Sequence, residues 1–101
     1  MLSSTPPSPS FRRVELSASA EQVPAGHLWS LAWQVIGSEV AVSSVQLASA
    51  SESGLEMIES ISDQGRRQVI FARPGLFTFT LTVVFQDGLR RSQQIRVRVT
   101  N

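Results

Sequence analysis

The sequence predicts an all-β fold, an antiparallel β-sandwich of about seven strands in two sheets. Three observations lead to this prediction. Helical periodicity is nearly absent from the 101 residues. Apolar and polar residues alternate instead over short runs, which is the period of a strand with one buried face. Turn-forming residues separate these runs at intervals of about 8 to 12 residues, as they do in sandwiches.

The chain has the length of one domain with its own hydrophobic core. Residues 1–10 end in "STPPSPS", which predicts a flexible or polyproline-like linker. Residues 11–101 form the predicted sandwich. The initial Met, the linker and the strand-like final run together predict a module taken from a longer protein.

The first predicted strand is "FRRVELSA", in which Val14 and Leu16 share one face. The segment "EQVPAG" ends it, because Pro24 lacks a backbone N–H and glycine allows a tight turn. The second strand is "HLWSLAWQV". Its alternation places Trp29, Leu31, Trp33 and Val35 on one face.

The middle of the chain is less regular. "VAVSSVQL" predicts a third strand whose alternation slips at Ser43 and Ser44, which indicates a β-bulge. "ASASESG" is predicted as a polar loop. "LEMIESIS", residues 55–62, fits either a strand or one to two helical turns, and we favour the strand. "DQGRR", residues 63–67, is predicted as a turn.

The last quarter of the chain alternates most clearly. "QVIFA", "LFTFTLTVVF" and "QIRVRV" each place apolar residues at odd positions, with threonines between them in the second run and arginines in the third. The predicted core residues are Leu31, Trp33, Val35, Phe71, Phe77, Phe79, Leu81, Val83, Ile95, Val97 and Val99.

The length of the turn between the last two strands can be predicted from the register of the pair, that is, from which residues would lie opposite each other. A two-residue turn at Asp87-Gly88 would place Leu81 opposite Gln94 and Phe79 opposite Arg96. That register would bury unpaired polar groups at about 2–7 kcal/mol each. We therefore predict a longer loop around Gly88, or a bulge beside it, despite the "DG" signal for a tight hairpin.

These runs resemble a known group of domains. "VELSASAEQVPAGHLWSLAWQV" is similar to the opening of bacterial immunoglobulin-like, PKD-like and fibronectin type III-like modules, with a "P-x-G" turn and then "L-x-W". "VIFARPGLFTFTLTVVFQDG" and "QIRVRV" are similar to their closing strands. The resemblance covers nearly all of residues 11–100. It implies an immunoglobulin-like sandwich with Trp33 between the sheets, and it implies no particular function.

The sequence offers no catalytic or metal-binding pattern, so we expect no catalytic residues, no metal and no cofactor. Cysteine is absent, and His27, the one histidine, lies beside a predicted turn. The carboxylates have neither zinc nor calcium spacing. The net charge of +1 gives no reason to expect nucleic-acid binding. No apolar run approaches the roughly 20 residues of a membrane helix, so membrane insertion is not expected.

Two features suggest contact with a ligand or partner. Trp29, near a strand end, is either a core residue or a platform for a sugar ring. Arg96 and Arg98 share the outward face of the final strand, with Arg90 and Arg91 in the predicted loop before it. This arginine group either binds an anionic ligand or acidic protein surface, or protects a strand edge from aggregation.

The acidic segment, residues 48–63, adds a variant of the partner hypothesis. It holds four acidic and no basic residues, which suggests that it docks against the arginines of a neighbouring module. Such an interface would weaken with salt.

We therefore expect a non-catalytic module of a larger bacterial surface or secreted protein, located outside the cell or in the cell envelope. Its expected role is that of a spacer, or protein–protein adhesion to neighbouring modules or a surface partner. Two alternatives stay open: a module that binds carbohydrate or an anionic ligand, and an immunoglobulin-like appendage of a phage particle.

Overall fold

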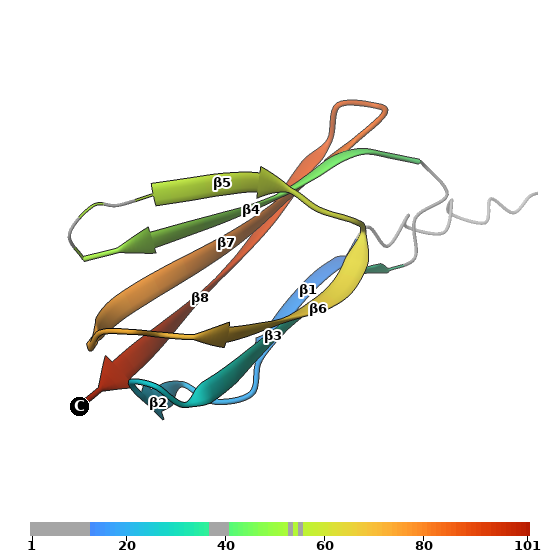
Figure 1. Ribbon diagram of the computed structural model, residues 1–101. Helices are drawn as coiled ribbons and strands as arrows, with labels where there is room; N and C mark the ends of the chain where they lie inside the picture. Colours follow the sequence, from blue (N-terminus) through green and yellow to red (C-terminus); the bar gives the residue numbers. More distant parts are fainter. Residues whose placement is uncertain (1–12, 37–40, 53, 55) are drawn as a thin grey trace, which may run out of the picture.

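The structure is an all-β sandwich of two packed sheets (Figure 1). It is a computed structural model that describes residues 13–36, 41–52, 54 and 56–101. The predicted linker at residues 1–10 lies outside the described residues, as does Leu55. The strands are β1 (Arg13–Ala18), β2 (Gln22–Pro24), β3 (Leu28–Ile36), β4 (Val42–Ser51), β5 (Glu56–Ser60), β6 (Gln64–Ile70), β7 (Gly75–Phe85) and β8 (Arg90–Thr100).

One sheet has the order β1-β3-β6 and the other the order β2-β8-β7-β4-β5. The eighth strand is β2, which lies within the segment predicted to be only a break. The chain leaves the first sheet after β1 and joins the second through β2, which runs parallel to the end of β8. All other pairs are antiparallel, so the larger sheet is mixed.

The core lies between the sheets and consists of odd-numbered apolar residues of β3, β4, β7 and β8, even-numbered residues of β1, Val23 of β2, and Phe71 after β6. The buried residues are Val14, Leu16, Val23, Trp29, Leu31, Trp33, Val45, Leu47, Phe71, Phe79, Leu81, Val83, Phe85, Val97 and Val99. Of the predicted core, Val35, Phe77 and Ile95 are half-buried and pack against this cluster. The other eight predicted core residues are buried.

The β7–β8 hairpin has the register that burial of both apolar faces requires. Phe79 lies opposite Ile95 and Phe77 opposite Val97. Three residues, 86–88, form the loop, because the Phe85 N–H donates to the Leu89 carbonyl oxygen at 2.9 Å. Gly88 has a φ of +91°, and a residue in this left-handed conformation allows a three-residue loop to close the hairpin. The prediction of a loop longer than two residues is confirmed.

Three expectations for the middle of the chain have mixed outcomes. The register between β4 and β7 shifts between Val42 and Ser44, which confirms the predicted bulge. β5 confirms the strand within residues 55–62. The predicted loop "ASASESG" is wrong over residues 48–51, because these continue β4. Residues 48–50 pair with both β5 and β7, and Ser51 pairs with β7.

The prediction of a turn at residues 63–67 is also wrong, since β6 begins at Gln64. Gly65 lies opposite Trp33 in the β3–β6 pair. A Cβ at position 65 would lie 2.8 Å from Cζ2 of the Trp33 indole, so the ring covers this glycine closely. The indole Nε1 also donates to the Ser62 carbonyl oxygen at 2.9 Å. A tryptophan from the neighbouring strand thus supplies the packing that glycine lacks in a strand.

Candidate functional site: a groove along the β8 edge

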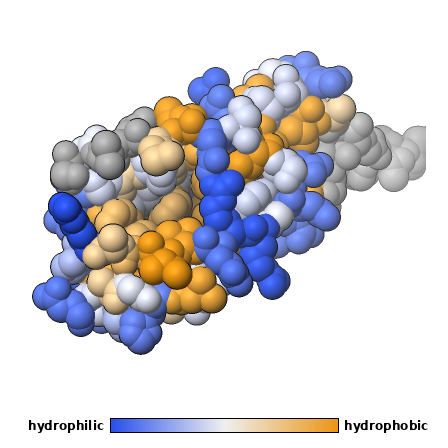
Figure 2. All heavy atoms as spheres, in the orientation of Figure 1, coloured by the Kyte–Doolittle hydropathy of each residue, from blue (hydrophilic) through white to orange (hydrophobic). Residues whose placement is uncertain are grey.

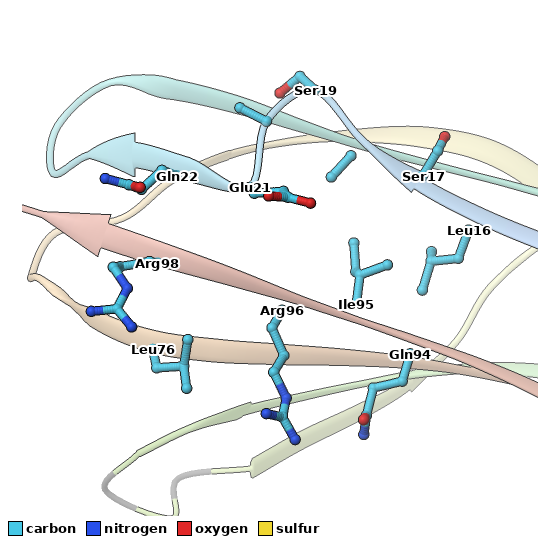
Figure 3. A pocket seen from close by; sticks show the side chains of 12 residues that line it. Leu16, Ser17, Ser19, Glu21, Gln22, Leu76, Gln94, Ile95, Arg96 and Arg98 are labelled. Carbon is cyan, nitrogen blue, oxygen red and sulfur yellow. The ribbon is translucent and has the colours of Figure 1, made fainter.

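The candidate site is an open groove of about 870 Å³ between β8 and the segment that leads from β1 into β2. One side is lined by residues 16–22 and the other by residues 94–96 and 98, with Leu76 of β7 below (Figure 3). Ile95 points toward Leu16, whereas Gln94 and Arg96 lie on the opposite side of β8 (Figure 3).

The groove exists because the chain changes sheets between β1 and β2. β1 pairs with β3, and β2 pairs with β8 only from Arg98 to Thr100. Within the described residues, no strand pairs with residues 90–97 of β8 on the side away from β7. This stretch is therefore a sheet edge, and the departing chain forms a wall beside it.

The hydrogen-bond pattern shows which backbone groups face the groove edge. In an antiparallel pair, alternate residues direct both N–H and C=O toward the partner strand. The hydrogen bond from the Phe85 N–H to the Leu89 carbonyl oxygen, together with the register of the pair, shows that the odd residues of β8 direct their N–H and C=O groups toward β7. The even residues must then face the other way, and Arg98 does so, because its N–H donates to the Glu21 carbonyl oxygen at 2.9 Å.

The structure brings two of the four predicted arginines to this groove. Arg96 and Arg98 are exposed and line it. The expectation that Arg90 and Arg91 lie in a loop is wrong, because they are the first residues of β8. Arg90 has the same parity as Arg96 and Arg98, and Arg91 has the opposite parity, so the four do not form one stripe.

Arg96 and Arg98 form no ion pair within the part of the chain that the structure describes. The ion pairs found there join Arg13 to Glu15 and Arg67 to Glu59. Two positive charges therefore stand beside the edge without a partner from these residues. The charged side chains that line the groove are these two arginines and Glu21.

Trp29 is a core residue, which is one of the two roles that the sequence left open, and the other role, a platform for a sugar ring, is wrong. Its side chain is 1% exposed. The ring stacks on Phe79 with centroids 5.1 Å apart, and it lies 5.5 Å from Phe71. Its Nε1 donates to the Ala20 carbonyl oxygen at 2.8 Å. No ring face is left for a sugar.

The acidic segment is partly engaged within the domain. Glu59 pairs with Arg67 across the space between the sheets. The Glu52 carboxylate accepts a hydrogen bond from the Leu76 backbone N–H at 2.6 Å. These two carboxylates are therefore less available for the arginines of a neighbouring module than the sequence indicated.

A second opening, of about 280 Å³, lies between β5 and β6. Phe71, Phe77, Phe79 and Met57 line it, beside the Glu59–Arg67 pair. The exposed apolar residues Leu28, Met57, Ile58 and Ile70 lie on β3, β5 and β6. On the face in Figure 2, hydrophobic residues gather on both sides of a hydrophilic band. Sequence reasoning did not anticipate this opening, because it depends on how the two sheets face each other.

The described residues contain no group of three or more His, Cys, Asp or Glu side chains arranged to hold a metal ion. His27 lies in the turn between β2 and β3, where its N–H donates to the Pro24 carbonyl oxygen at 3.1 Å. In the part of the chain that the structure covers, no helix is long and apolar enough to cross a membrane.

Comparison with known proteins supports the fold. No family model matches the chain, and no curated protein matches it. The structure is similar to part of an engineered protein, with a TM-score of 0.67 and 15% identity over 92% of this chain. This chain spans only 21% of that protein.

It is also similar to the soluble domain of PmoD from Methylocystis sp. ATCC 49242 (Rockwell). The TM-score is 0.62 at 10% identity, covering 88% of this chain and 92% of that domain. At such low identities the two likenesses show a shared β-sandwich fold and nothing about function.

Proposed function

We propose that this chain is a non-catalytic, immunoglobulin-like module of a larger bacterial surface or secreted protein, and that it adheres to a protein partner. The β8 groove is its proposed docking site. The proposal is supported by the sandwich fold, by the resemblance of its first and last strands to such modules, and by the groove itself. The groove offers charged and apolar groups for binding.

The observation that carries the proposal is the position of Arg96 and Arg98. Both are exposed beside a sheet edge, and neither has an ion-pair partner among the described residues. Leu16, Leu76 and Ile95 add apolar surface to the same groove. A protein segment can use both kinds of surface, whereas an anionic sugar would use mainly the arginines.

The experiment measures binding of two anionic probes to the purified chain. One probe is a labelled oligoglutamate peptide of about ten residues, and the other is a sulfated oligosaccharide. The double variant Arg96→Ala/Arg98→Ala is compared with Arg66→Ala/Arg73→Ala, which removes the same charge elsewhere. We expect the first variant to weaken peptide binding about tenfold, which is about 1.4 kcal/mol, and the control to bind like the wild type.

Equal losses in both double variants, or no peptide binding by the wild type, would contradict the proposed docking site. Clear preference for the sulfated oligosaccharide would favour the alternative of a module that binds anionic glycan. That alternative now stands on the arginines alone, because Trp29 is buried. The proposal of a phage appendage is tested by the parent gene, through neighbouring capsid or tail genes.

A further inference from the structure

We propose that the groove binds its partner as an added β-strand along β8, and that the partner is an extended segment of another protein in which acidic and apolar residues alternate. This inference rests on the proposed docking function and specifies its chemistry. Strand addition is a recurring mode of peptide recognition, in which backbone hydrogen bonds give affinity and alternate side chains give specificity.

The backbone of β8 provides the first part of the argument. Its even residues Arg90, Ser92, Gln94 and Arg96 direct N–H and C=O groups away from β7, and no described strand pairs with them. From Arg90 to Arg96 this edge is seven residues long, or about 23 Å at the usual rise of a strand. It therefore accommodates a partner segment of about five to seven residues.

The chain itself shows that this edge accepts another strand. β2 pairs with the end of β8 over three residues. Hydrogen bonds from the Arg98 N–H to the Glu21 carbonyl oxygen and from the Ala25 N–H to the Thr100 carbonyl oxygen flank that pairing. It stops where the preceding residues lead back to β1 in the other sheet. A partner strand would continue along the same edge where β2 leaves it.

The two faces of β8 determine the side chains of the partner. One face carries Gln94 and Arg96, so the adjacent residues of an added strand would be acidic. The other face carries Ile95, which points toward the buried Leu16 (Figure 3), so residues on that face would be apolar. Because side chains alternate along a strand, the predicted motif is acidic–apolar–acidic–apolar.

Charge also argues against a second copy of β8 as the partner. Two β8 edges pairing with each other would bring arginines near arginines, and like charges opposed across a pair of strands are destabilising. The arginines thus discourage self-pairing of this edge and favour an acidic partner.

The experiment uses an eight-residue peptide of alternating valine and glutamate as the probe. Gln94→Pro removes an outward N–H without touching the ladder to β7, a position where proline is tolerated in an edge strand. Gln94→Ala is the matched control, since it loses the same side chain, including its hydrogen bond to Thr80, and keeps the N–H. Two further peptides are compared with the first. One has the same composition with its valines and glutamates in separate blocks, and the other is the alternating peptide with N-methyl groups on alternate residues.

We expect Gln94→Pro to bind the alternating peptide at least tenfold more weakly than Gln94→Ala does, and N-methylation of the peptide to weaken its binding to the wild type at least tenfold. The block peptide should bind at least tenfold more weakly. In amide hydrogen exchange, binding should protect the N–H groups of Ser92, Gln94 and Arg96. Thermal unfolding of Gln94→Pro checks that the domain is folded.

If the alternating and block peptides bind equally, or the proline and alanine variants bind equally, strand addition is wrong. Strand addition is also wrong if the alternating peptide does not bind the wild-type protein at all. In the first two cases the proposed function survives when Arg96→Ala/Arg98→Ala still weakens peptide binding about tenfold. If that double variant binds normally as well, the docking site itself is wrong.

Discussion

Replacing Gly65 with alanine should destabilise the domain through a clash with Trp33. The added Cβ would lie 2.8 Å from Cζ2, 3.2 Å from Cε2 and 3.4 Å from Cη2 of the indole. The ring cannot easily move, because it is 7% exposed and its Nε1 is held by the Ser62 carbonyl oxygen. Forced overpacking of this kind costs about 1–3 kcal/mol.

Part of that cost is offset, because alanine reduces the conformational freedom of the unfolded chain by about 0.4–1 kcal/mol relative to glycine. We therefore expect a net loss of about 1–2 kcal/mol. For a domain of this size, that lowers the Tm by roughly 5–15 °C. Thermal unfolding followed by tryptophan fluorescence or circular dichroism measures this shift.

A double-mutant cycle with Trp33→Phe identifies the cause. The smaller ring vacates the atoms that the new Cβ would meet, so Gly65→Ala should cost at least about 1 kcal/mol less in that background. An unchanged or higher Tm for Gly65→Ala alone would refute the packing of Trp33 over Gly65. Strict additivity in the cycle would show that the loss has another origin.

Three further predictions concern stability. Trp33→Ala should cost about 3–5 kcal/mol, a large share of a typical total of about 5–15 kcal/mol; an unchanged urea midpoint would contradict the core position of Trp33. Gly88→Ala should cost about 1–2 kcal/mol because φ is +91° there; since nothing lies within 4 Å of the added Cβ, backbone strain is the whole of this cost. Gly88→Asn should cost less. Equal Tm values for the wild type and both variants would argue against the left-handed turn. Glu59→Gln should change the unfolding free energy by less than about 1 kcal/mol, since the two side chains of the Glu59–Arg67 pair are 44% and 38% exposed. A loss above about 1 kcal/mol in chemical denaturation would contradict this weak contribution of the pair.

Local alternation was sufficient for much of the fold. The odd residues 77–85 of β7 and 95–99 of β8 are apolar, and only a register that places odd opposite odd buries both sets. A loop longer than two residues, or a bulge, therefore followed from parity. The bulge near Ser43 followed in the same way, because a slip in alternation must be absorbed by an extra residue. These features depend on neighbours along the chain or across one hairpin.

The errors have a common cause in contacts between distant parts of the chain. Gly65 and its flanking charged residues indicate a turn when read alone, but an indole from β3 covers the glycine and makes it a strand position. The sequence left Trp29, near a strand end, open to a role in the core or in sugar binding. The structure decides for the core, because Phe79, fifty residues later in the chain, stacks on its ring. No local pattern encodes either partner.

The sequence by itself determined that this protein is a β-sandwich, which residues of its last two strands face inward, and how those strands align. Tertiary structure alone decided that β1 and β2 join different sheets, that most of β8 is left as an edge, and that Arg96 and Arg98 stand beside it. The physical reason is that alternation specifies which face of a strand is buried, whereas the neighbours of its backbone are set by pairing between segments far apart in the chain.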